Sequence, residues 1–233
     1  MKNKAGMAAW LLGLGLLAGG PAQAALLDRG GGLIYDSDLN ITWLKDANYA
    51  ATQFAASSGA QGDADGLMNW SAANAWAAGL TYGGYSDWRL PTTLQPDASC
   101  GSSFDAGAPY GVQSYGYNCT GSELGHLFYT ELGGTAGSSI LASGDPDLAL
   151  FQNIQSDVYW SGTAYAPDPA IYAWYFLTDL GFQSFYNQGI EFYAWAVRPG
   201  DVAAVPEPAS VMLVGLGLAG LVALRRRRSL GAS

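Results

Sequence analysis

Positive charge is scarce in the central part of this sequence. Residues 25–204 contain four cationic side chains against eighteen carboxylates, so this stretch has a net charge of −14. Nucleic acids and anionic membrane surfaces are bound through basic patches, and the composition excludes both as partners. Sulfated polysaccharides are disfavoured for the same reason. Neutral ligands and divalent cations remain compatible with this charge.

Residues that support nucleophilic catalysis are also few. His126 is the single histidine, and a lone histidine on a helix is more often packed or solvated than catalytic. The chain has no nucleophile elbow, so Ser-His-Asp and Cys-His schemes lack their signals. The sequence predicts a protein without enzymatic activity. A polysaccharide-acting hydrolase that uses two carboxylates remains an alternative, because acidic residues are numerous.

The N-terminal end has the three parts of a secretory signal peptide. Lys2 and Lys4 precede an apolar run over residues 7–17, and Ala22-Gln23-Ala24 provides a small-x-small cleavage site. We therefore expect residues 1–24 to direct export and to be removed by signal peptidase.

The C-terminal end has a second apolar run with distinctive neighbours. Residues 209–224 are uncharged and are followed by four arginines at 225–228. As a helix this run would span about 24 Å, short of the ~30 Å hydrocarbon core, and arginine snorkelling can cover the difference. The arginines favour a cytoplasmic C-terminus. Val205-Pro206-Glu207-Pro208 precede the run, and the two prolines predict an extended strip there.

This order of parts resembles the PEP-CTERM sorting signal over residues 205–233. In that family exosortase, a membrane protease-transpeptidase, recognises and processes the tail in Gram-negative bacteria that build exopolysaccharide or biofilm matrix. The resemblance implies a transient inner-membrane anchor and final delivery to the cell surface or matrix. An ordinary C-terminal anchor that is never cleaved is the alternative.

Residues 25–204 are long enough for one domain with its own core. Its two cysteines, Cys100 and Cys119, are expected to form a disulfide in an oxidising compartment. The bond would close a loop of about 20 residues, worth ~3 kcal/mol in the chain-entropy model.

Local patterns predict the elements of this domain. A hairpin is expected over 32–36 and 40–44, a short helix within 46–60, and an amphipathic helix over 69–79 with Asn69 or Ser71 near its start. A second main helix is expected over 122–132, capped by Ser122. Strands are predicted at 158–161, 171–178, 181–185 and 190–198, and irregular loops at 95–121 and 133–146.

Several short blocks in this order resemble the Lcl C-terminal-like domain family, formerly a domain of unknown function. The matching blocks are Gly32-Leu33-Ile34-Tyr35-Asp36, Thr42-Trp43-Leu44, Gly66-Leu67-Met68-Asn69-Trp70 with Ala73 and Trp76, Asp87-Trp88-Arg89-Leu90-Pro91-Thr92, Glu123-Leu124, Tyr159-Trp160-Ser161-Gly162-Thr163, Ala173-Trp174 and Val197-Arg198-Pro199. The resemblance implies an α+β fold of the C-type-lectin-like or sulfatase-modifying-factor-like kind. Such a fold has two helices flanking small twisted antiparallel sheets, with long loops between them. Some family members are surface adhesins that bind glycans.

Within these blocks, Asp87, Trp88, Arg89, Trp160 and Arg198 are expected to form a structural motif. An arginine can pair with carboxylates or loop carbonyls and stack on a tryptophan ring. Ligand binding by the two arginines is the alternative. Most tryptophans are expected in the core, with one or two on a loop rim available to stack on sugar rings.

Asp63-x-Asp65-Gly66 is the candidate calcium site, because hard cations prefer carboxylate and carbonyl oxygens. The loop is not an EF-hand, since Asn74 stands at its twelfth position. The alternative is a cap and acidic first turn for the following helix. Asp36 and Asp38 are a weaker pair.

Together these patterns predict an exported, surface-sorted matrix protein that binds carbohydrate or another surface component, with Ca²⁺ as a candidate ion. A structural matrix protein without a discrete ligand is the alternative, and the hydrolase is a further one.

Overall fold

A four-stranded antiparallel sheet contains both the first and the last strand of the described domain. This computed structural model describes residues 26–202. The strand order is β1-β2-β3-β11, with bounds Leu26–Gly30, Leu33–Asp36, Ile41–Leu44 and Val197–Pro199. β2 and β3 form the predicted hairpin. Arg29 Nε donates to Asp201 Oδ1 at 2.8 Å, so the two ends of the domain are tied together.

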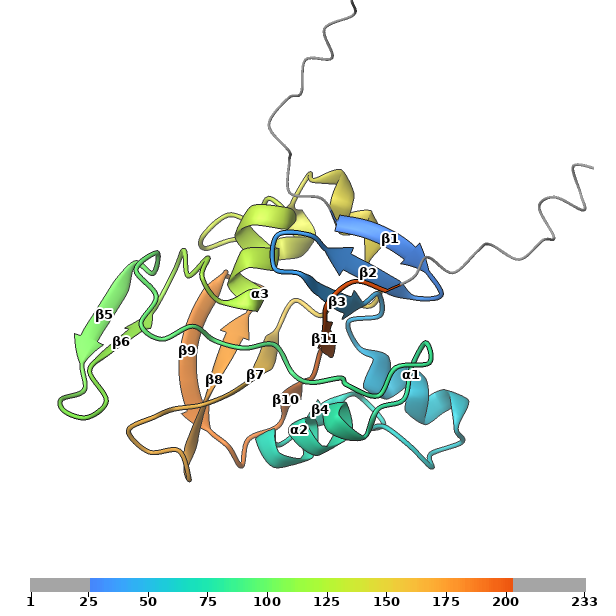
Figure 1. Cartoon of the computed structure of the whole chain (residues 1–233), viewed down its shortest axis with the longest axis horizontal. Coiled ribbons are helices and arrows are strands. Elements are labelled where there is room, and N and C mark those ends of the chain that lie inside the picture. Colours follow the sequence, from blue (N-terminus) through green and yellow to red (C-terminus); the bar gives the residue numbers. More distant parts are fainter. Residues whose placement is uncertain (1–25, 203–233) are drawn as a thin grey trace, which may run out of the picture.

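A five-stranded sheet lies beside the first (Figure 1). Its order is β4-β10-β7-β8-β9, with bounds Leu67–Met68, Phe192–Tyr193, Val158–Ala164, Tyr172–Leu177 and Phe182–Asn187. Its neighbouring strands are antiparallel except for β10 and β7, which are parallel. Trp174 and Phe176 are buried on one face of β8, whereas Tyr175, on the other face, is only partly buried.

The prediction of one strand over 190–198 is wrong, because the chain crosses from one sheet to the other there. β10 ends at Tyr193 in the five-stranded sheet and β11 begins at Val197 in the four-stranded sheet. Between them, the indole N–H of Trp195 donates to the carbonyl of Leu44 at 2.7 Å, and the Leu44 N–H donates to the carbonyl of Ala196 at 3.0 Å. The buried Trp195 ring therefore joins the two sheets through the core.

Residues 26–202 contain three α-helices where the family resemblance implies two. They are α1 Tyr49–Ala56, α2 Trp70–Gly79 and α3 Glu123–His126. A π-helical turn, Leu127–Glu131, continues α3, and 3₁₀ turns cover Ile140–Ala142, inside a predicted loop, and Pro146–Leu150. Asn69 caps α2 by accepting from the Ala72 N–H at 3.0 Å.

Ser122 occupies the N-cap position of α3 but does not cap it with its side chain. Its hydroxyl accepts from the backbone N–H of Leu94 at 3.1 Å instead, so the predicted capping role is wrong. The hydroxyl is thus used to hold the incoming loop against the start of α3.

A two-stranded hairpin stands within residues 95–121, which were predicted to be irregular. β5 Ser102–Asp105 pairs with β6 Val112–Tyr115, and the Cys100–Cys119 disulfide closes the base of this hairpin. The Gly101 N–H also donates to the carbonyl of Tyr117 at 2.7 Å. All four residues of β5 are exposed, so its sequence lacks the alternation that signals a strand.

Helices and small separate sheets make this an α+β fold, as the sequence predicts. The C-type-lectin-like or sulfatase-modifying-factor-like arrangement stays an expectation of the family resemblance.

Candidate functional site

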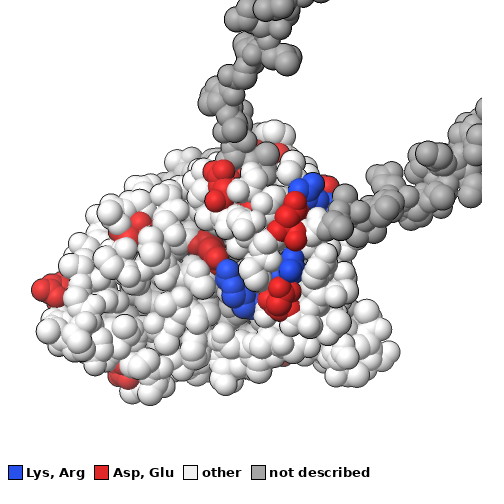
Figure 2. Space-filling model, viewed as in Figure 1, with Lys and Arg blue, Asp and Glu red and all other residues white. Residues whose placement is uncertain are grey.

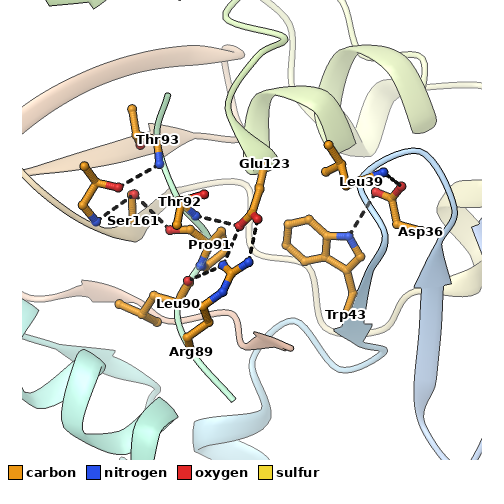
Figure 3. A network of polar contacts seen from close by, with 11 residues as sticks. Asp36, Leu39, Trp43, Arg89, Leu90, Pro91, Thr92, Thr93, Glu123 and Ser161 are labelled. Atoms are coloured by element: carbon orange, nitrogen blue, oxygen red, sulfur yellow. Dashed lines mark hydrogen bonds and ion pairs between the residues drawn. The ribbon is translucent and has the colours of Figure 1, made fainter. Parts of the chain in front are cut away.

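Arg89 joins its own strand-like segment to the start of α3. Its guanidinium donates twice to the carboxylate of Glu123, with both N–O distances at 2.7 Å, and once to the carbonyl of Leu90 at 3.0 Å. The same carboxylate accepts from the backbone N–H of Thr92 at 2.7 Å (Figure 3). The fork geometry fixes the position of the Arg89–Thr92 segment relative to α3. Arg89 thus has the structural role that the sequence predicts.

Arg198 makes a second fork on β11. It donates to the two carboxylate oxygens of Asp87 at 2.8 and 2.9 Å, and its guanidinium carbon lies 4.1 Å from the ring centroid of Tyr85. Tyr85 thus fills the stacking place expected for a tryptophan. The hydrogen bond from Arg198 lowers the pKa of Asp87 below its ordinary value of 3.8. Both arginines of the shared blocks are therefore engaged with protein groups.

Most tryptophans highlighted by the sequence are core residues. Trp160 is fully buried, and its indole N–H donates to the carbonyl of Met68 at 2.9 Å. Trp88 is 3% exposed, and Trp70 donates to the carbonyl of Ser161 at 2.8 Å. Ser161 in turn donates to the carbonyl of Pro91 (Figure 3). These rings stabilise the fold, and a ligand would have to use a different aromatic surface.

Asp63 and Asp65 lie in a loop before β4, and both carboxylates accept from nearby backbone N–H groups. Asp63 Oδ1 accepts from Asp65 and Gly66, both at 3.2 Å, and Asp65 Oδ1 accepts from Leu67 at 3.0 Å. The bond from Leu67 is the main cause of a lowered pKa for Asp65. Neither residue caps α2, because Asn69 does so. Calcium binding at this loop stays a prediction.

A cleft between α1 and α2 is the best candidate for ligand binding. It has a volume of about 420 Å³, and it is lined by Gln53, Gln61, Gly62, Ala75, Trp76, Gly79, Leu80 and Thr81. None of these described residues carries a charge. The cleft combines one large aromatic ring with side-chain amide and hydroxyl groups.

Hydrogen bonds orient the polar walls of this cleft. The indole N–H of Trp76 donates to Gln53 Oε1 at 2.9 Å, and Gln53 Nε2 donates to Gln61 Oε1 at 3.1 Å. The backbone N–H of Gln61 donates to the hydroxyl of Ser57 at 2.9 Å. Trp76 therefore has its polar edge satisfied by the protein, and its ring orientation is fixed.

Gly62 lets the loop after α1 approach the helix closely. Its φ is +79°, and a Cβ at this position would lie 2.1 Å from the carbonyl oxygen of Ala50. Only glycine fits such a left-handed and crowded position without strain. The wall of the cleft thus depends on this residue. In the sequence Trp76 stands out only as part of a shared block, and Gln53 and Gln61 belong to no motif.

A neighbouring cleft of about 390 Å³ on the other side of α1 is less suitable. Its carboxylate, Asp46, already accepts from the Thr52 hydroxyl at 2.6 Å, from the Asn48 N–H at 3.0 Å and from Asn153 Nδ2 at 3.0 Å. The charged group is therefore used to hold the start of α1, and the uncharged α1–α2 cleft is the better candidate.

His126 is half-buried at the end of α3. Its Nε2 lies 3.1 Å from Glu131 Oε1, and this hydrogen bond raises the pKa of His126 above its ordinary value of 6.5. The histidine belongs to a cluster with Glu131 and Asp36. It lies apart from the residues that line the α1–α2 cleft.

Comparison with known proteins identifies the C-terminal tail. A family model for the PEP-CTERM protein-sorting motif matches residues 204–228. No curated protein and no solved structure matches the chain. Between residues 26 and 202, no helix is long and apolar enough to cross a membrane. The predicted signal peptide over 1–24, the motif Val205-Pro206-Glu207-Pro208, the span over 209–224 and the arginines at 225–228 lie outside the described residues. The motif match shows an exported, membrane-transiting protein that exosortase processes and that is sorted to the surface.

Proposed function

We propose that this protein is a non-enzymatic binding protein of the cell surface or extracellular matrix that recognises neutral carbohydrate in the α1–α2 cleft. The observation that carries the proposal is the set of groups in that cleft. Trp76 provides an aromatic wall, and Gln53 and Gln61 provide amide groups beside it. The proposal includes delivery by exosortase to the surface of a Gram-negative bacterium that produces exopolysaccharide.

The chemistry of a neutral sugar suits this arrangement. A sugar ring has an apolar C–H face that can lie against an aromatic ring, and hydroxyl groups at its edge that need hydrogen-bond partners. Amide side chains offer two donors and an acceptor oxygen each, so they can bond hydroxyl groups in either direction. Because Gln53 already holds the indole N–H, little ordering of Trp76 is needed on binding, and this lowers the entropic cost.

The distribution of charge also supports a neutral ligand. Figure 2 shows the charged side chains of one face gathered mainly over the four-stranded sheet and α3, whereas the surface over α2 carries almost none. A strongly acidic domain repels sulfated or carboxylated chains at long range. A neutral polysaccharide feels no such repulsion.

Hydrolysis is not part of the proposal. Glycoside hydrolysis uses two carboxyl groups on either side of the bond that breaks. Among the described residues, the lining of the α1–α2 cleft includes no Asp or Glu. The cleft is therefore suited to holding a sugar and not to cleaving one.

A glycan array tests this function. The full chain is applied in detergent to neutral, carboxylated and sulfated glycans, with Ca²⁺ and with a chelator. We expect signals confined to neutral glycans, and loss of those signals in Trp76→Ala. Tyr186→Ala is the matched control, because Tyr186 is another exposed aromatic, 51% accessible on β9, outside the cleft.

The alternative outcomes are distinct. Absence of binding to any glycan in either condition would leave the structural matrix role in place of the lectin role. Release of shorter sugars from an arrayed polysaccharide would favour the hydrolase. Signals that survive in Trp76→Ala would mean that the cleft is not the binding site.

A further inference from the structure

Three metal-ligating side chains from separate segments converge near the turn after β2. Asp36 ends β2, His126 ends α3, and Glu131 ends the π turn. One donor atom from each lies within 4.8 Å of the other two. Asp36 is fully buried, and the side chains of Glu131 and His126 are 2% and 14% exposed. This Asp36–His126–Glu131 cluster is thus largely shielded from water.

The π turn places Glu131 beside His126. In an α-helix, two residues five apart differ in direction by about 140°, so their side chains point to different faces. A π turn has a hydrogen bond that spans five residues, seen here from the Leu132 N–H to the Leu127 carbonyl at 2.9 Å. The wider turn brings Glu131 Oε1 to 3.1 Å from His126 Nε2. Single π turns inside α-helices are rare and often occur at functional sites.

Protein groups also orient Asp36. Its Oδ1 accepts from the N–H group of Asp38 at 3.1 Å. Oδ1 also accepts from the N–H group of Leu39 at 3.0 Å, and Oδ2 lies 3.4 Å from the indole nitrogen of Trp43 (Figure 3). The last distance is long for an N–H···O bond. Such outer contacts hold the carboxylate of a metal site in place while one oxygen remains oriented towards the ion.

Among the described residues, no lysine or arginine forms an ion pair with this cluster. Within residues 26–202, the four Lys and Arg side chains pair with other carboxylates: Arg29 with Asp201, Lys45 with Asp28, Arg89 with Glu123, and Arg198 with Asp87.

A third carboxylate approaches from the solvent side, with Asp38 Oδ2 at 3.9 Å from His126 Nε2. Nearby, burial and the charges of Asp145 and Glu131 raise the pKa of Asp147. The imidazolium of His126 can offset at most one of the negative charges of Asp36, Glu131 and Asp38. Buried carboxylates without a cation are costly.

We propose that Asp36, His126 and Glu131 bind a divalent transition-metal ion of the Zn²⁺ class, with Asp38 on the open side of the site. A doubly charged ion neutralises the two buried carboxylates. It also links the β2–β3 turn to the α3 segment. One imidazole and two carboxylates are ligands that such ions accept.

The spacing of the donors suits a small ion. Bonds of about 2.0–2.2 Å place neighbouring ligands of a tetrahedral ion about 3.4 Å apart. His126 Nε2 lies 3.1 Å from Glu131 Oε1 and 3.9 Å from Asp38 Oδ2. A carboxylate oxygen of Asp36 lies within 4.8 Å of the His126 and Glu131 donors. Ca²⁺ prefers six to eight oxygen ligands, so the imidazole disfavours it here.

Titration with ZnCl₂ and CoCl₂ tests the site. The full chain is purified in mild detergent without a polyhistidine tag. Titration calorimetry is expected to give a stoichiometry of one Zn²⁺ per chain. Thermal unfolding is expected to show a higher melting temperature with Zn²⁺ than without it. Co²⁺ is expected to give the intense visible absorption of a four-coordinate site.

Two variants and one control keep the test specific. His126→Gln and the isosteric Glu131→Gln are each expected to weaken Zn²⁺ binding at least about tenfold, since loss of an outer partner alone has an effect of this size. Asp105→Asn, at an exposed carboxylate on β5 outside any candidate site, is expected to leave Zn²⁺ binding unchanged. Circular dichroism identifies a variant that fails to fold. The Zn²⁺ affinity of the other, folded variant then tests the site.

Absence of Zn²⁺ binding to the wild type would overturn the proposal. So would Zn²⁺ binding that persists unchanged in both variants, because this would show weak attachment to surface carboxylates.

Discussion

The side of the domain around α3 and β11 differs from the side around α1 and α2 in how it uses polar groups. Around α3 and β11, two arginine forks join segments distant in sequence. Each carboxylate oxygen of Glu123 and Asp87 accepts a hydrogen bond from a guanidinium group in these forks. Around the cleft, the polar groups are amides, hydroxyls and an indole, and none of the described lining residues is charged. The arginine forks on the first side serve folding, and uncharged groups are available for ligand recognition on the second side.

This difference follows from the small number of cations. All four Lys and Arg side chains of the described part are engaged in ion pairs within the domain. A ligand that needs a cation would have to compete with one of these contacts. Ligand recognition that depends on Trp76 and two glutamines avoids this competition.

The largest expected effect comes from breaking the Arg89 fork. Glu123→Ala leaves the guanidinium without its partner and the Thr92 N–H without an acceptor. We expect a loss of roughly 3 kcal/mol in the free energy of unfolding, the low end for a broken buried pair because Arg89 is partly exposed. Chemical denaturation measures this. Asp28→Ala removes the exposed pair with Lys45 and should cost at most about 1 kcal/mol. Equal losses in the two variants would contradict a special role for the fork.

Removal of the disulfide should lower the stability of the domain slightly less, and local opening should be greatest in the β5–β6 hairpin. The double variant Cys100→Ser/Cys119→Ser is expected to lose about 2–3 kcal/mol, because the unfolded chain regains loop freedom. Limited proteolysis should then cut within 101–118 first. Cleavage that occurs first near α1 or α2 would show that the disulfide does not mainly stabilise the β5–β6 hairpin.

The Asp87–Arg198 fork predicts that the stability of the fold decreases at acidic pH. The pKa of Asp87 is lowered in the folded state, so its pair stabilises the fold above pH 3.8 and loses this effect as pH falls through the lowered pKa. The stability difference between wild type and Asp87→Asn should therefore be present at pH 7 and shrink below about pH 4. Thermal unfolding over this range measures it. A difference that does not change with pH would mean that the carboxylate charge is unimportant.

The smallest expected effect concerns calcium. If the Asp63–Asp65 loop binds Ca²⁺, the melting temperature should rise by a few degrees in Ca²⁺ relative to a chelator, because binding to the folded state stabilises it. Asp63→Ala should abolish the increase. An unchanged melting temperature in the wild type would remove the site and leave the turn-forming role of the two carboxylates.

Sequence patterns predicted the regular elements with strong periodicity. The β2–β3 hairpin and the extent of α2 follow from local residue spacing, whereas spacing leaves Asn69 and Ser71 as equal candidates for the cap and the structure shows that Asn69 takes it. Sequence patterns failed to predict the structure where tertiary contacts decide it. The split of 190–198 depends on Trp195 reaching Leu44, and the β5–β6 hairpin depends on the disulfide and on pairing between exposed residues.

The candidate site was less predictable than the fold. Arg89 and Arg198 were expected to form forks, but their partners could not be paired by spacing, since Glu123 and Asp87 lie 34 and 111 residues away. Gln53 and Gln61 carry no motif. Gln53 reaches Trp76 from α1, and Gln61 joins them from the loop that Gly62 lets approach α1 closely. His126 and Glu131 are brought together by a π turn that no periodicity in the sequence signals.

Calorimetry with a neutral oligosaccharide selected by the glycan array tests the central claim most directly. Wild type, Trp76→Ala and Tyr186→Ala are titrated at about 0.05 M and about 0.5 M salt, because screening weakens charge-dependent binding. We predict binding that hardly changes with salt, that weakens more than about tenfold in Trp76→Ala, the size of effect expected for an aromatic hot spot, and that is retained in Tyr186→Ala. Binding that falls steeply with salt, or that is unaffected in Trp76→Ala, would contradict neutral carbohydrate recognition in the α1–α2 cleft.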